Sequence, residues 1–129
     1  MRSVLTNISH ASTRGVLMVL ALLLGSLPAA AHSELRRSVP AAGAVLMQAP
    51  EQLELYFNER VQLTALRLYR DGSEEISLPR RAIRSATTEI ITLPPLPSGG
   101  YRAEWRIISA DGHPAGGTVP FRIEAPNRP

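Results

Sequence analysis

Residues 101–107 read Tyr-Arg-Ala-Glu-Trp-Arg-Ile, and in this stretch large apolar side chains alternate with charged ones. Tyr101, Trp105 and Ile107 share one face of an extended chain, while the charged side chains between them share the other. A period of two residues over a short run is typical of an antiparallel strand with one buried face. The stretch therefore predicts a β-strand that contributes a tryptophan to the core.

The same alternation recurs in three other segments of the chain. Their apolar members are Leu53, Leu55 and Phe57 in residues 53–58, Leu66 and Leu68 in residues 65–70, and Val119, Phe121 and Ile123 near the C-terminus. Clusters of proline and glycine, such as residues 94–100, separate the runs and stop strands. About seven short strands with frequent turns predict an all-β, immunoglobulin-like fold, which is a Greek-key β-sandwich or barrel.

Residues 1–31 have the features of a secretory signal peptide. Arg2 and Arg14 precede an uncharged apolar run at residues 16–24, and three alanines follow at residues 29–31. The apolar run is shorter than the ~20 residues that a membrane-spanning helix needs. We therefore expect cleavage after the third alanine, which leaves one exported domain, residues 32–129, without stable membrane insertion. That domain begins with His32.

Removal of the leader changes the charge balance. Two of the 14 basic residues lie in the leader and all 11 acidic residues follow it, so the processed chain has a net charge of +1. The sequence pI of about 10.2 is therefore no sign of a nucleic-acid partner, and none is expected. The chain has no cysteine, which excludes disulfides and thiolate metal sites. Glu59 and Arg60 are expected to be solvent-exposed charges.

Only two of the three histidines, His32 and His113, remain after the predicted cleavage. Cleavage would give His32 a free α-amine beside its imidazole ring. An α-amine has a pKa of about 7.7–8.0, so a metal ion can displace its proton at neutral pH. The amine nitrogen and ring Nδ1 can then close one chelate ring on a single ion.

Asp111-Gly112-His113 can supply further ligands, because residues two apart in extended chain project to the same side. With the two nitrogens of His32, the Asp111 carboxylate and His113 ring complete a nitrogen-rich set of four donors. Such a set in tetragonal arrangement favours Cu(II) over zinc and over hard cations. Asp-Gly is also a common turn dipeptide, and an N-terminal histidine can be an accident of processing. The spacing alone leaves a copper site and a plain turn both open.

Two long segments resemble the copper-resistance protein C (CopC) family of small periplasmic Greek-key proteins. They are residues 31–61, AHSELRRSVPAAGAVLMQAPEQLELYFNERV, and residues 99–123, GGYRAEWRIISADGHPAGGTVPFRI. The resemblance implies a periplasmic location and one Cu(II) per processed chain, bound by the amine and ring of His32, by Asp111 and by His113. It also implies a partnership with an inner-membrane transporter of the copper-resistance protein D kind.

Some members of this family carry a second, Cu(I) site built from a methionine-rich stretch, because thioether sulfur suits the softer ion. Here Met47 is the only methionine after the predicted leader. We therefore expect a protein that binds Cu(II) only.

The leading hypothesis is a copper-binding protein, not an enzyme, that buffers copper, confers resistance or delivers the ion to a membrane transporter. A second hypothesis is a copper redox enzyme with a histidine brace. Such an enzyme needs a substrate cleft, and the short turns predicted here leave few loops to build one. A third hypothesis is an immunoglobulin-like interaction module without metal.

Overall fold

The computed structural model describes residues 33–125. These residues form seven strands: β1 (Leu35–Val39), β2 (Ala44–Leu46), β3 (Gln52–Arg70), β4 (Glu74–Ile76), β5 (Ser85–Thr92), β6 (Gly99–Ser109) and β7 (Pro114–Ile123). The all-β prediction with about seven strands is confirmed. The described residues contain no helix, and thus none long and apolar enough to cross a membrane. The predicted leader and His32 lie outside the described residues, so the cleavage site stays a prediction.

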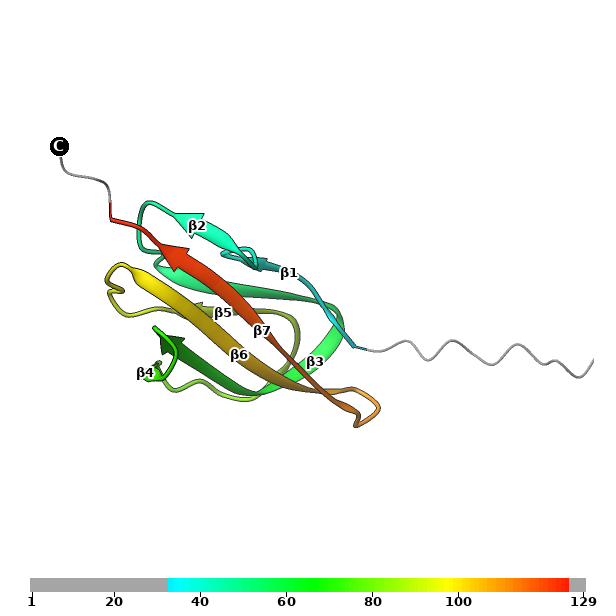
Figure 1. Cartoon of the computed structure of the whole chain (residues 1–129). Coiled ribbons are helices and arrows are strands. Elements are labelled where there is room, and N and C mark those ends of the chain that lie inside the picture. The colour runs from blue at the N-terminus through cyan, green and yellow to red at the C-terminus, as the bar shows by residue number, and fades with distance from the viewer. Residues whose placement is uncertain (1–32, 126–129) are drawn as a thin grey trace, which may run out of the picture. The chain divides into compact units, whose positions relative to one another are not determined.

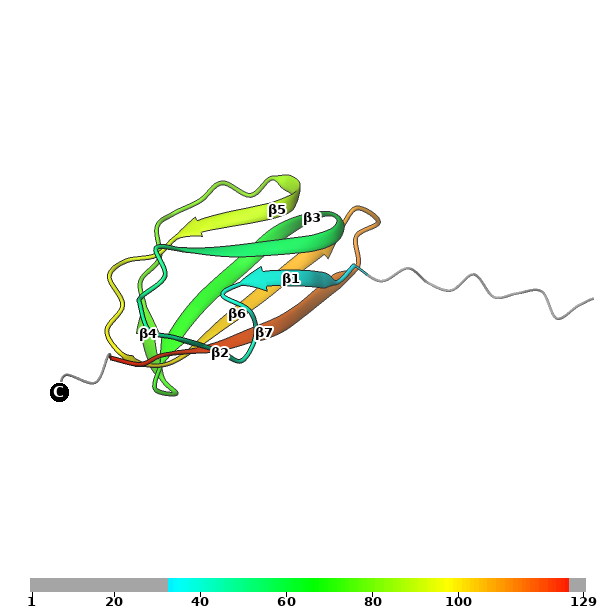
Figure 2. The same ribbon diagram turned by 90° about the horizontal axis from the view of Figure 1, so that it is seen from above.

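Strand β3 runs through both layers of the fold (Figure 1). Its first half pairs antiparallel with β1 and β5, and its second half pairs antiparallel with β6 and β4. β7 continues the sheet beside β6, and β2 joins β7 in parallel. Figure 2 shows β1 and β5 on either side of one half of β3, with β6 and β7 in the layer behind. The sheet is therefore curled on itself as a β-sandwich.

The continuity of β3 differs from the sequence pattern, which indicated separate runs at residues 53–58 and 65–70. The register of β3 shifts against β5 between Tyr56 and Val61, and against β6 between Leu63 and Ala65. An irregularity of this kind bends a strand and can reverse which side chains face inward. The alternation is therefore interrupted in the sequence although the strand continues.

The core lies between the two layers and is built mainly from the alternating residues. Its buried members are Leu53, Leu55, Phe57, Val61, Leu63, Leu68, Ile91, Leu93, Leu96, Tyr101, Ala103, Trp105, Ile107, Val119, Phe121 and Ile123. Trp105 packs edge-on against Phe57, with ring centroids 5.5 Å apart. The two aromatic rings thus join opposite layers, and Trp105 is a core residue as its position in the run predicted.

Candidate metal centre

The turn between β6 and β7 carries the predicted Asp-Gly-His ligands. The amide of Gly112 donates to the carbonyl oxygen of Ser109 at 2.9 Å, and the Ser109 amide donates to the carbonyl oxygen of His113 at 2.9 Å. Gly112 has a φ of 86°, a left-handed conformation that side chains disfavour. The backbone therefore closes tightly at the glycine, and the flanking residues come close together.

Asp111 and His113 touch through their side chains. Oδ2 of Asp111 lies 2.8 Å from Nδ1 of His113. The two side chains are 67% and 79% exposed, so the pair sits at the surface of the molecule. A carboxylate and an imidazole ring held in contact and open to solvent can exchange the proton between them for a metal ion.

The side chain of Ser109 holds Asp111 and His113 in place through hydrogen bonds. Its side chain is buried, and its hydroxyl donates to Oδ1 of Asp111 and accepts the His113 amide at 3.0 Å. The hydrogen bond from Ser109, followed by that from His113, lowers the pKa of Asp111 to about 2. Asp111 is therefore ionised at neutral pH. Sequence analysis missed Ser109, although serine near an aspartate in a turn is a known signal for side-chain to backbone bonding.

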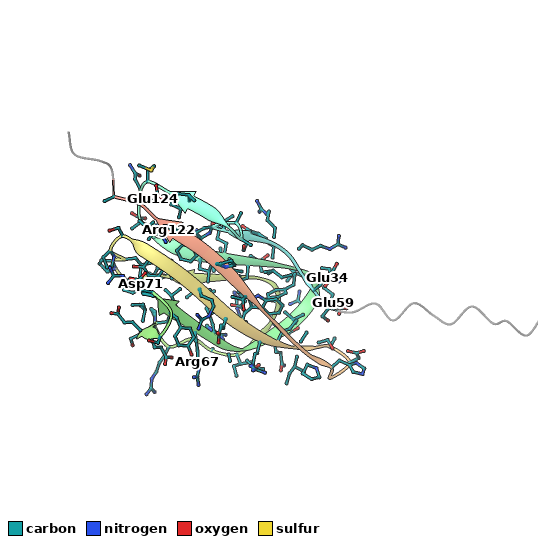
Figure 3. The ribbon with its side chains drawn as sticks, viewed as in Figure 1. Glu34, Glu59, Arg67, Asp71, Arg122 and Glu124 are labelled. Carbon is teal, nitrogen blue, oxygen red and sulfur yellow. The ribbon has the colours of Figure 1, made fainter. Side chains whose placement is uncertain are left out.

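The beginning of the described chain is tied to β3. The amide of Glu34 donates to Oδ1 of Asn58 at 2.9 Å, and the Asn58 amide donates to the Glu34 carbonyl oxygen at 3.1 Å. The buried hydroxyl of Ser33 donates to the Glu59 carboxylate. Figure 3 shows Glu34 and Glu59 together at the end of the sandwich where β1 begins. Glu59 is half-buried, so the expectation that it is a solvated charge is wrong.

The β6–β7 turn lies at the same end of the sandwich. Val61 of β3 pairs with Ser109, only two residues beyond the contact between Glu59 and Ser33. Figures 1 and 2 agree that the β6–β7 turn and the start of β1 share one end of the domain. One short segment of β3 thus anchors both the residue after His32 and the turn with Asp111.

The structure brings together two of the three predicted ligand residues, Asp111 and His113. His32 lies outside the described residues. Among residues 33–125 no group of three or more histidine, aspartate or glutamate side chains is arranged to hold a metal ion. The described part of the chain therefore provides half of the predicted donor set.

Comparison with known proteins gives one consistent result. Residues 35–124 match the CopC domain family. Copper resistance protein C of Escherichia coli is 35% identical over 107 residues, which cover 74% of this chain and 84% of that protein. Copper transport protein CutJ of Bacillus subtilis is 34% identical over 113 residues, or 82% of this chain. This chain spans only 21% of the length of CutJ.

A solved structure has the same fold. The crystal structure of PcoC, a methionine-rich copper resistance protein from Escherichia coli, superposes with a TM-score of 0.56 at 34% identity. The superposition covers 73% of this chain and all of that chain. The domain match, the curated relatives and this structure agree, and the chain belongs to the CopC family.

Proposed function

We propose that this chain binds one Cu(II) ion after export, through the amine and ring of His32, the Asp111 carboxylate and the His113 ring. CopC proteins bind copper or confer copper resistance and are not enzymes, which supports copper as the ligand. The ion is cargo that the protein holds and passes on. Neither a catalytic residue nor a substrate cleft is needed for this role.

The contact between Asp111 and His113 is the observation that carries the proposal. The observed separation of Oδ2 and Nδ1 is 2.8 Å. This is a hydrogen-bond distance, so a carboxylate oxygen and an imidazole nitrogen already lie close enough to become neighbouring ligands of one ion. Nitrogen and oxygen donors of this kind suit Cu(II).

The contacts of Ser33 support His32 as the second half of the site. Ser33 is bound to Glu59, next to the part of β3 that pairs with Ser109. A residue attached to Ser33 starts from the end of the sandwich that carries the Asp-Gly-His turn. The half-buried carboxylate of Glu59 would place a further negative charge near a dication at this end.

The oxidation state follows from the available donors. Cu(I) prefers sulfur, and Cu(II) prefers nitrogen and oxygen. The chain has no cysteine, and Met47 is its only methionine beyond residue 31. Met47 follows β2 and is 55% exposed, so its thioether is not part of a cluster of sulfur ligands. We expect no tight Cu(I) site in the monomer, in contrast to what a methionine-rich sequence would provide.

The place of action is the periplasm, and the receiving partner is an inner-membrane transporter of the copper-resistance protein D kind. The leader features of residues 1–31 support export. The exposed position of the Asp111 and His113 side chains supports transfer, because a partner's ligands can reach the ion from solvent.

The test is a Cu(II) titration of protein that begins at His32 and of the same protein with one additional residue before it. The extension removes the α-amine from the chelate, so we expect affinity to fall by about tenfold or more, with a changed electron paramagnetic resonance spectrum. His32→Ala, Asp111→Ala and His113→Ala should each weaken binding in the same way.

Glu51→Ala is the matched control, because Glu51 is an exposed carboxylate away from the turn. It should leave the affinity for Cu(II) unchanged. Equal affinity of the extended and unextended proteins would refute the N-terminal chelate. Failure of the protein starting at His32 to bind Cu(II) would leave only the metal-free interaction module.

A further inference from the structure

A groove of about 780 Å³ lies on the layer formed by β3, β6 and β7, apart from the candidate metal centre. The side chains and backbone that line it include Ala65, Arg67, Glu104, Arg106, Gly116 and Gly117. Arg67, Arg106 and Gly116 are exposed, so the groove opens on the outer face of the sheet. Nothing in the proposed copper site uses this surface.

No large side chain projects from the strands on either side of Arg106, because the residues that pair with it are small. Ala65 and Gly116 pair with Arg106 from the neighbouring strands β3 and β7. A Cβ atom at Gly116 would come within 2.9 Å of the carbonyl oxygen of Trp105. Only glycine fits at this position, which keeps the backbone accessible along the groove.

The groove has an excess of positive charge. Among residues 33–125, neither Arg67 nor Arg106 has a carboxylate within ion-pair distance. Glu104, the acidic side chain in the lining, is bound to Arg102 at 2.8 Å. A hydrogen bond with the Tyr69 hydroxyl, followed by attraction to the nearby carboxylates of Glu75 and Glu104, raises the pKa of Arg67. The guanidinium of an arginine is charged at neutral pH in any case. The two arginines are thus available to bind an external anion.

We propose that an extended acidic segment of a protein partner binds in this groove. Two carboxylates of the segment, on alternate residues, would bind the two arginines. Arg67 pairs with Glu104 across the strands, and Arg106 lies two residues farther along β6. Their Cα atoms are therefore about 8 Å apart, while alternate side chains of an extended peptide lie about 7 Å apart on one face. Each guanidinium can bind one carboxylate in bidentate fashion.

The lining favours a peptide over a lipid surface. Surfaces that insert into the membrane interface carry large apolar side chains beside the basic ones. Here Ala65, Glu104 and two glycines surround the arginines. Trp105 also lines the groove, but its side chain is buried in the core, so little apolar surface is exposed beside the arginines. Two cations beside small side chains suit the carboxylates of a peptide.

Arg106 in the groove lies three residues before Ser109, the residue of β6 from which the Asp-Gly-His turn begins. At about 3.3 Å per residue this is about 10 Å. A partner docked here would lie beside the candidate metal centre. The docking itself does not require the metal, so the two proposals can fail independently.

The experiment measures fluorescence anisotropy of a labelled peptide that alternates Glu and Thr, with the metal-free, exported chain as receptor. We expect this peptide to bind at least about tenfold more tightly than one that alternates Gln and Thr. Arg67→Glu and Arg106→Glu should each reduce affinity by about tenfold, and their combination should abolish binding. Raising the salt from about 0.05 M to about 0.5 M should weaken binding.

Arg122→Glu is the control, because Arg122 is an exposed arginine of β7 that does not line this groove. Equal loss of binding in this variant would overturn the proposal, since it would indicate nonspecific attraction. Equal affinity for the Gln peptide, or absence of Glu-peptide binding, would also overturn it. Binding to phosphatidylglycerol vesicles without peptide binding would assign the arginines to a membrane surface instead. Melting curves verify that each variant is folded.

Discussion

Ser109 connects the core of the sandwich to the pair of candidate ligands on its surface. Its hydroxyl lies below the surface and bonds both the carboxylate of Asp111 and the backbone of His113. The sequence named the two ligands but not this serine, because only the closed turn brings its hydroxyl under them. Ser109 therefore stabilises both the turn and the position of the two candidate ligands.

The first prediction concerns Ser109→Ala. Loss of the hydroxyl removes the main cause of the low pKa of Asp111, so that pKa should rise from about 2. The free energy of unfolding should fall by about 1 kcal/mol, and Cu(II) affinity should fall several-fold. A carbon-13 NMR titration of the carboxyl group and a copper titration measure these changes. Ser73→Ala, at an exposed turn, should change neither, and an unchanged pKa of Asp111 would contradict the assigned role.

The second prediction concerns pH. A depressed pKa means that Asp111 stays ionised as pH falls, and its carboxylate is lost as a ligand only near pH 2. Imidazole and α-amine nitrogens bind protons at much higher pH, so they should control copper release. Visible absorption of the copper protein should therefore disappear well above pH 3. Asp111→Asn should weaken binding without abolishing this pH dependence, and release only near pH 2 would show that the carboxylate controls it.

At the scale of elements, β7 combines two different requirements for glycine. Gly116 faces outward and keeps the groove floor open, whereas Gly117 pairs with Trp105 and faces inward. A Cβ atom at Gly117 would lie 2.6 Å from Cζ2 of the Trp105 ring. Alternation along the strand thus places one glycine on each face, and the packing of the single tryptophan depends on the inner one.

The third prediction is that Gly117→Ala displaces the Trp105 ring. Overpacking of this kind should reduce the free energy of unfolding by about 1–3 kcal/mol. The near-ultraviolet circular dichroism and the fluorescence of Trp105 should change with it. Thr118→Ala, on the exposed face of the same strand, should be within about 0.5 kcal/mol of the parent. Equal stability of the two variants would show that the ring can move aside without cost.

At the scale of the whole molecule, the site and the core are separate. The candidate ligands project from a turn, while the buried residues come from both layers and meet around Phe57 and Trp105. β3 connects them, since it contributes to both layers and contacts both Ser33 and Ser109. The fold should therefore be present before copper binds.

The fourth prediction is that His113→Ala shifts the melting temperature of the metal-free protein by less than about 4 °C. His113 is 79% exposed, so its removal leaves no cavity. Leu55→Ala, at a fully buried position of β3, should cost about 2–5 kcal/mol. Added Cu(II) should raise the melting temperature of the parent by more than that of His113→Ala, because stabilisation by a ligand grows with its affinity for the folded state. Unfolding of metal-free His113→Ala at room temperature would contradict this separation.

The sequence by itself determined the class of fold, most of the core and the identity of the candidate ligands. Alternation in residues 101–107 and 119–123 identified side chains that are buried in the structure, because a strand's two faces differ every second residue. Donor chemistry and the resemblance identified Asp111 and His113, which the structure brings into contact.

Only the tertiary structure decided that residues 52–70 form one strand, since register shifts interrupt the periodicity on which sequence analysis depends. It also decided the roles of Ser109 and Glu59, whose partners arise from contacts made by folding. Ser33 and Glu59 are 26 residues apart in the chain, yet they meet through pairing of β1 with β3. Local patterns determine which face of a strand is buried, but distant contacts determine which polar groups meet at its end.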